Sequence, residues 1–277
     1  MKVRLLAPAA AVALTLALVP AASAWAPAST AAIHPGVQVF TNGAQCTANF
    51  VYTDGSNTYL GQAAHCSGTG GNTETNGCSA GSLPEGTPVE IDGSDGVAYS
   101  GVMVYNSWIR MQAAHEADAE TCAYNDLALI RLNPADVAKV NPSVPGWGGP
   151  TGTGSEGAAG SSTYSYGNSE LRGGVTFLSP KQGTVLSRTA GGWSTTVYTA
   201  SPGIPGDSGS GFLNASGQAA GVLSTVAIAP FAGSNGVGDL PRELSWAAAH
   251  GLSASVVNGD VPFQTSLTTA IRTQLGL

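Results

Sequence analysis

Residues 206–211 read Gly206-Asp207-Ser208-Gly209-Ser210-Gly211, a serine set among glycines, and this stretch decides the fold together with two others. The second is Ala63-Ala64-His65-Cys66, which follows an apolar segment predicted as a strand. The third is Asn125-Asp126-Leu127-Ala128-Leu129-Ile130-Arg131-Leu132, an acid directly before another apolar segment. A histidine, an acid and a serine therefore follow one another along the chain, each in a local pattern of its own.

These residue types suit nucleophilic catalysis. A serine hydroxyl is a weak nucleophile at neutral pH and needs a base within hydrogen-bonding reach. The imidazole of His65 titrates near neutrality and can accept the Ser208 proton, while Asp126 can hold the ring in the required tautomer. Taken singly, each residue also fits a structural role, His65 in a loop, Asp126 in a turn and Ser208 in a glycine-rich loop. The joint pattern favours chemistry.

The three motifs, in the order His, Asp, Ser, resemble the trypsin-like (chymotrypsin-fold) serine peptidases. Gly209-Ser210 stands where many animal members have two glycines, which looks like the bacterial secreted branch. The resemblance implies a serine endopeptidase with His65, Asp126 and Ser208 as catalytic residues and an acyl-enzyme intermediate. It also implies an oxyanion hole formed by the backbone amides of Gly206 and Ser208, a protein or peptide substrate, and no cofactor or metal.

Two other functions compete with this interpretation. A non-catalytic binding protein on the same fold stays open, because fold does not establish activity. An esterase-like serine hydrolase fits less well, since its GxSxG elbow and its Ser, Asp, His order are absent.

Composition supports an all-β protein. The chain has 277 residues, of which 43% are hydrophobic and 10% charged, so it should fold rather than stay disordered. Its 38 glycines and 16 prolines indicate short strands and tight turns instead of a helical bundle. Ten basic residues face 17 acidic ones without any basic run, which argues against a nucleic-acid partner held through its phosphates.

The first 24 residues have the pattern of a signal peptide. Lys2 and Arg4 precede an apolar run over 5–20, and Ala22-Ser23-Ala24 is a small-residue cleavage pattern. The run is shorter than the roughly 20 residues of a membrane span. We therefore expect a secreted, extracellular protein with no membrane partner after signal removal. We also expect it to be a monomer.

Export places the four cysteines in an oxidising space, where they favour disulfides. They are Cys46, Cys66, Cys78 and Cys122, they allow three pairings, and their spacing does not resemble a zinc site. Cys46 with Cys66 would close a short loop, and Cys78 with Cys122 a longer one. The resemblance implies the first of these bridges, next to His65.

The body of the chain is expected to form two antiparallel β-barrels with a C-terminal helix. After an N-terminal segment 25–36, we expect a first barrel over 37–145 that carries His65 and Asp126. A glycine-rich connector over 146–160 leads to a second barrel and helix over 161–277, which carry Ser208. The predicted strands are 37–40, 48–53, 58–61, 88–91, 98–105, 127–132, one near 164, 175–178, 183–187, 193–199, 211–213 and 220–225, and the predicted helices are 239–249 and 266–274.

Some features depart from the family pattern. No Ile-Val-Gly-Gly start is present to pair with Asp207, so a buried Asp207 needs another cation, Arg172 first or Arg188 second. Residues 227–251 form a long segment that ends in a helix, where the family has a short loop bordering the pocket. Such a segment either alters access to the pocket or is a tolerated surface insertion. The expected substrate-binding residues are Pro202, Ser224, Thr225 and Val226. The specificity position, Pro202, is not an acid, so we expect cleavage after small or medium apolar residues.

Overall fold

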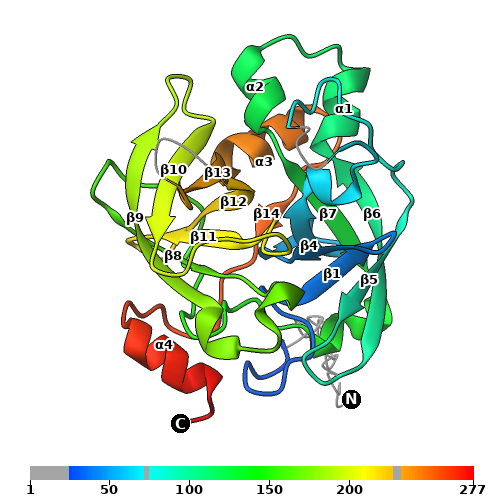
Figure 1. The fold of residues 1–277 in the computed structure, drawn as a ribbon. Helices are drawn as coiled ribbons and strands as arrows, with labels where there is room; N and C mark the ends of the chain where they lie inside the picture. Colours follow the sequence, from blue (N-terminus) through cyan, green and yellow to red (C-terminus); the bar gives the residue numbers. More distant parts are fainter. Residues whose placement is uncertain (1–24, 72–74, 227–231) are drawn as a thin grey trace, which may run out of the picture.

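The computed structural model describes residues 25–71, 75–226 and 232–277, and these form two antiparallel β units (Figure 1). The predicted signal peptide lies outside the described residues. The first unit is an eight-stranded sheet in the order β14-β3-β4-β7-β6-β5-β1-β2. Its strands are β1 (Gln38–Thr41), β2 (Ala44–Thr47), β3 (Val51–Thr53), β4 (Thr58–Ala63), β5 (Pro88–Asp92), β6 (Ala98–Asn106), β7 (Leu127–Leu132) and β14 (Ser255–Val256).

The second unit is a closed barrel in the order β10-β13-β12-β11-β8-β9. Its strands are β8 (Ser162–Tyr166), β9 (Pro180–Arg188), β10 (Ser194–Thr199), β11 (Gly211–Asn214), β12 (Ala219–Val226) and β13 (Asn235–Asp239). Four α-helices are described, α1 (Ser107–Ala113), α2 (Ala119–Tyr124), α3 (Leu240–Ala249) and α4 (Leu267–Gln274). In Figure 1, α3 lies between the two units and α4 ends the chain against the barrel side. The predicted all-β fold with a C-terminal helix is confirmed.

Central strand β7 shows why these residues form a sheet. It pairs with β4 on one side and β6 on the other, and every residue except Arg131 is buried. A short apolar run bounded by polar residues is typical of a strand covered on both faces. The start of this strand therefore has a fixed position, and Asp126 directly precedes it.

The turn between β3 and β4 follows from Asp54. Its carboxylate accepts hydrogen bonds from the backbone N–H groups of Ser56 and Asn57, which is the usual way an aspartate closes a turn. This hairpin confirms the predicted turn, and β4 then runs directly into the segment that carries His65.

The described part of segment 227–251 holds a strand that was not predicted, directly before the predicted helix. Strand β13 pairs with both β10 and β12 and so closes the second barrel, and α3 follows it at once. Alternating glycines, Gly236 and Gly238, hid this strand from sequence analysis, because strands are usually recognised by branched and aromatic residues.

Other differences between prediction and structure are local. The predicted strand at 175–178 is wrong, because this segment is a 3₁₀ turn, η4 (Thr176–Leu178). Sequence analysis did not predict strand β2 or helices α1 and α2. The two helices have 7 and 6 residues, which is too short for a helical pattern of apolar residues to be recognised. Both predicted helices are present, each capped at its start by a side chain, Asp239 for α3 and Ser266 for α4.

Two long-range links tie the chain together. Strand β14, from the region expected in the second barrel, pairs instead with β3 at the edge of the first sheet. Disulfides join Cys46 to Cys66 and Cys78 to Cys122. Over the described ranges, no helix is long and apolar enough to cross a membrane.

Candidate active site

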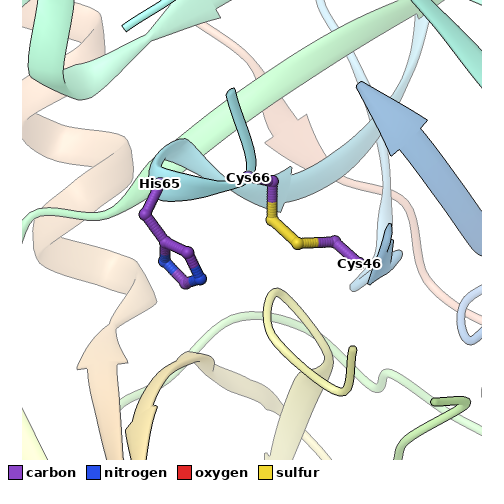
Figure 2. Close-up of side chains that lie close together, drawn as sticks. All are labelled: Cys46, His65 and Cys66. Carbon is purple, nitrogen blue, oxygen red and sulfur yellow. A yellow bond between two sulfur atoms is a disulfide. The ribbon is translucent and has the colours of Figure 1, made fainter. Parts of the chain in front are cut away.

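His65 lies on a 3₁₀ turn, η1 (Ala64–Ser67), directly after β4. Its backbone N–H donates to Asp126 Oδ1 at 2.9 Å, and its ring Nδ1 contacts Asp126 Oδ2 at 2.7 Å. The Cys46–Cys66 disulfide lies beside the histidine, as Figure 2 shows. The two sulfur atoms are bonded to each other, so they are not free thiolates that could ligate a metal with His65. The turn, the disulfide and the acid together fix the imidazole.

Asp126 is almost completely buried and accepts three hydrogen bonds on its carboxylate. The third comes from the hydroxyl of Ser224, 2.5 Å from Oδ2, at the end of β12 in the other unit. Sequence analysis expected Ser224 only at the substrate strand, and the contact with Asp126 was missed. Three donors from the two units therefore hold this carboxylate in place.

The environment of His65 favours its protonated form. Burial alone would lower the pKa of the imidazole, but the negative charge of Asp126 and the hydrogen bond to it outweigh burial. The pKa of His65 is therefore raised above the usual 6.5. Within the described residues Nε2 has no hydrogen-bond partner, so this nitrogen is available to a proton from outside the pair.

The loop that carries Ser208 packs against the strands that lead to His65. The backbone N–H of Thr47 donates to the Ser208 carbonyl at 2.8 Å. Gly209 has a φ of 85°, and a Cβ there would lie 2.7 Å from the Thr47 carbonyl oxygen and 2.8 Å from the Ala63 nitrogen. Only glycine permits this approach, which brings the serine loop next to the histidine turn.

Two backbone N–H groups near Ser208 are unused. The N–H of Asp207 donates to the Ile204 carbonyl, whereas the N–H groups of Gly206 and Ser208 donate no hydrogen bond within the described residues. Gly206 has a φ of 95°, which aims the turn in a direction that other residues rarely adopt. Free donors on either side of one residue are the arrangement that an oxyanion requires.

The structure does not join the serine to the histidine directly. No hydrogen bond connects Ser208 Oγ with His65 Nε2, although both residues are described and partly exposed. Catalytic hydrogen bonds are often long before substrate binds. The structure thus brings His65, Asp126 and the Ser208 loop together, without a hydrogen bond between Ser208 and His65.

Asp207 is fully buried beside the serine and is held by two cations. Arg172 contacts its Oδ2 at 2.5 Å, and Lys181 Nζ lies 3.1 Å from the same oxygen. Backbone N–H groups of Ser169 and Ile204 complete the set. Of the two arginines that were considered, Arg172 is the partner, whereas Arg188 pairs with Asp239.

Lys181 was missed by sequence analysis. Burial lowers the pKa of this lysine to about 8, the charge of Asp207 opposes the shift, and the nearby Arg172 adds to it. Its ammonium also donates to the carbonyls of Ser201 and Pro202. Arg172 donates to the Pro202 carbonyl as well, so both cations support the segment before Ser208.

The expected substrate-binding residues lie on two segments that one side chain connects. Asn235, which is buried, accepts from the Gly203 N–H and donates to the Thr225 carbonyl. It thereby ties the 202–208 segment to the end of β12. The side chain of Val226 is about half exposed at that end. Asn235 is a second residue that sequence analysis missed, since it lies within the unpredicted strand β13.

Comparisons with known proteins define the fold. No protein-family model matches the chain, and no curated protein sequence does. Among solved structures, Thermobifida fusca protease A is similar at 24% identity over 83% of this chain and 100% of that chain, with a TM-score of 0.53. Cellulomonas bogoriensis chymotrypsin (16% identity, 81% and 98% coverage, TM-score 0.49) and a glutamic acid-specific serine protease (19%, 81% and 100%, 0.47) are also similar.

The chain therefore has the fold of the chymotrypsin-like serine proteases, as the three motifs implied. This likeness extends over the whole solved chain of the Thermobifida protease. At such low sequence identity it establishes the fold, and the activity has to be argued from the residues of the site.

The unequal contacts of Asp207 predict unequal effects of removing its two cations. Arg172→Met should lower the free energy of unfolding by about 3–5 kcal/mol, because it breaks a buried ion pair. Lys181→Met should cost less, since burial already disfavours the lysine charge and Asp207 keeps Arg172 and two backbone donors. Denaturant unfolding at pH 7 measures both. Equal losses, or no loss for Arg172→Met, would contradict the assignment.

Proposed function

We propose that the protein is a secreted serine endopeptidase in which His65, Asp126 and Ser208 are the catalytic residues. The observation that carries the proposal is the 2.7 Å contact between His65 Nδ1 and Asp126 Oδ2, which leaves Nε2 free beside the serine loop. The unused N–H groups of Gly206 and Ser208 support it, because they form the donor pair of an oxyanion hole.

The residues suit a two-step acyl transfer. Ser208 Oγ attacks the peptide carbonyl while His65 Nε2 accepts the hydroxyl proton, and Asp126 stabilises the imidazolium that results. The N–H groups of Gly206 and Ser208 bind the oxyanion. His65 then gives its proton to the leaving amine, so that the C–N bond breaks and an acyl-enzyme remains. Water, deprotonated by the same histidine, hydrolyses the ester and regenerates Ser208.

Secretion and a protein substrate belong to the same proposal. Two disulfides, Cys46–Cys66 and Cys78–Cys122, suit an oxidising compartment outside the cytoplasm, in agreement with the signal pattern over 1–24. The peptide would extend along β12 beside segments 202–208 and 224–226, and the last residue of this strand, Val226, is half exposed. One observation favours the rival, a binding protein without activity, and it is the missing contact between Ser208 and His65.

Labelling with a serine-directed fluorophosphonate separates the two functions. The purified protein without residues 1–24 should be labelled covalently and should cleave a denatured protein substrate, since His65 activates Ser208. Ser208→Ala should lose both properties, and Ser210→Ala, which alters the next serine of the motif, should keep them. An unlabelled, folded parent protein would establish the binding-protein alternative.

The raised pKa of His65 predicts the acid side of the pH profile. The base acts only when it is neutral, so kcat/KM should fall as the pH drops, with a midpoint above pH 6.5. Asp126→Asn should move this midpoint to lower pH, because it removes the charge that stabilises the imidazolium. It should also reduce kcat by about 10⁴-fold, because an amide holds the imidazole in the wrong tautomer. A peptide ester without titratable groups is the substrate to use. A midpoint at or below pH 6.5 in the parent protein contradicts the geometry.

Cleavage preference should follow the absence of an acid at Pro202 and the presence of Val226 at the end of β12. We expect a peptide library to be cleaved after small or medium apolar residues. Val226→Gly, which removes a side chain beside the expected pocket, should shift the preference toward larger apolar residues. Efficient cleavage after arginine by the parent protein would contradict this assignment.

A further inference from the structure

Behind the candidate active site lies a second buried acid, Glu243 of α3. Its side chain is completely inaccessible to solvent, and Oε1 accepts a hydrogen bond of 2.9 Å from the backbone N–H of Asp126. The acid needs the space that Gly238 leaves, because a Cβ at that position would lie 2.6 Å from Oε1. A side chain on α3 thus accepts a hydrogen bond from the backbone of Asp126, the proposed catalytic acid in the first unit.

This contact completes the fixing of Asp126. The Asp126 carboxylate accepts from His65 and Ser224, and its backbone carbonyl accepts from the Ala64 N–H. The N–H of Asp126 is the remaining polar group of its backbone, and Glu243 is the acceptor that satisfies it. A buried N–H without an acceptor costs about 1–3 kcal/mol, and the residue that carries it tends to move toward another partner.

The surroundings of Glu243 disfavour its ionised form. The Asp126 carboxylate accepts from three donors, whereas the Glu243 carboxyl accepts from one, a backbone N–H, and its Oε2 has no partner within the described residues. In the part of the chain that the structure describes, the charged and titratable groups that act on Glu243 are two acids and two phenols: Asp126, Asp239, Tyr52 and Tyr105. The nearby cation Arg188 pairs with Asp239 rather than with Glu243. Burial, followed by the charges of the two acids, raises the pKa of Glu243 well above its usual range.

We propose that Glu243 is a positioning residue that, in its neutral acid form, holds the backbone of Asp126 and thereby orients the Asp126–His65 pair. This role rests on the proposed peptidase function. Neutrality matters because a second negative charge next to Asp126 would bind the His65 proton more tightly and leave less free base at neutral pH. The helix contributes a hydrogen-bond acceptor to the site without adding charge.

Three variants test the role. Glu243→Gln keeps a neutral acceptor, Glu243→Leu keeps the approximate volume without an acceptor, and Glu90→Gln removes an exposed acid on β5 as the matched control. We expect Glu243→Gln to retain kcat/KM within about threefold and to keep the acid-side midpoint of the pH profile. Glu243→Leu should lose at least tenfold in kcat with little change in KM. Activity of Glu243→Leu equal to that of the parent would overturn the positioning role.

The charge state has its own readout. An acid that is neutral when folded and ionised when unfolded destabilises the protein as the pH rises above its unfolded value. Relative to Glu243→Gln, the unfolding equilibrium constant of the parent should therefore rise by roughly tenfold for each pH unit above about 4.5, until the folded acid ionises. Glu90→Gln should show no such trend. A lowered acid-side midpoint in Glu243→Gln, or a pH-independent difference in stability, would show that Glu243 is ionised and contradict the proposal.

Two measurements do not need catalysis, so failure of this inference is distinguishable from failure of the proposed function. One is the pH dependence of unfolding. The other is the proton NMR signal of the His65 Nδ1–H, which should keep its position in Glu243→Gln and shift or broaden in folded Glu243→Leu. If the parent protein is inactive but both signatures appear, the peptidase proposal fails and the positioning of Asp126 stands. If the signal is the same in Glu243→Leu, the positioning role is wrong.

Discussion

The buried carboxylate of Asp126 is the interaction on which the candidate site depends. A charge removed from water must be met by several donors, or its burial would destabilise the fold. Here the donors come from both units, His65 after β4 and Ser224 at the end of β12. Satisfying one charge therefore sets the position of the histidine and also holds the second unit against the first.

Asp207 applies the same constraint on the other side of the serine. Its charge is met by Arg172 and Lys181, and these cations also bind carbonyls at 201 and 202. The loop before Ser208 is thereby fixed while two of its N–H groups stay free. The chain has only ten basic residues, and Arg172, Lys181 and Arg188 all pair with buried acids. Two of these cations, Arg172 and Lys181, hold the loop before Ser208.

Local patterns made much of this predictable. The strand 127–132 and the turn after Asp54 depend on neighbouring residues, and both are found as expected. The pairing of Arg172 with Asp207 was also predicted, because a buried acid requires a cation, but the second cation, Lys181, was missed. Strand β13 was missed because its glycines give no alternating apolar pattern, although closing the barrel requires it.

Residues that act only through distant partners could not be recognised from the sequence. Glu243 stands in the first turn of a helix, where an acid ordinarily complements the helix dipole and faces water. Lys181 and Asn235 likewise look like ordinary polar strand residues. What distinguishes all three is a partner supplied by another segment of the chain: Asp126, Asp207 and the Gly203 N–H. The sequence shows that these residues are polar, but it does not show that they are buried, because burial depends on the tertiary fold. Buried polar residues with remote partners are therefore the part of a site that only the structure can reveal.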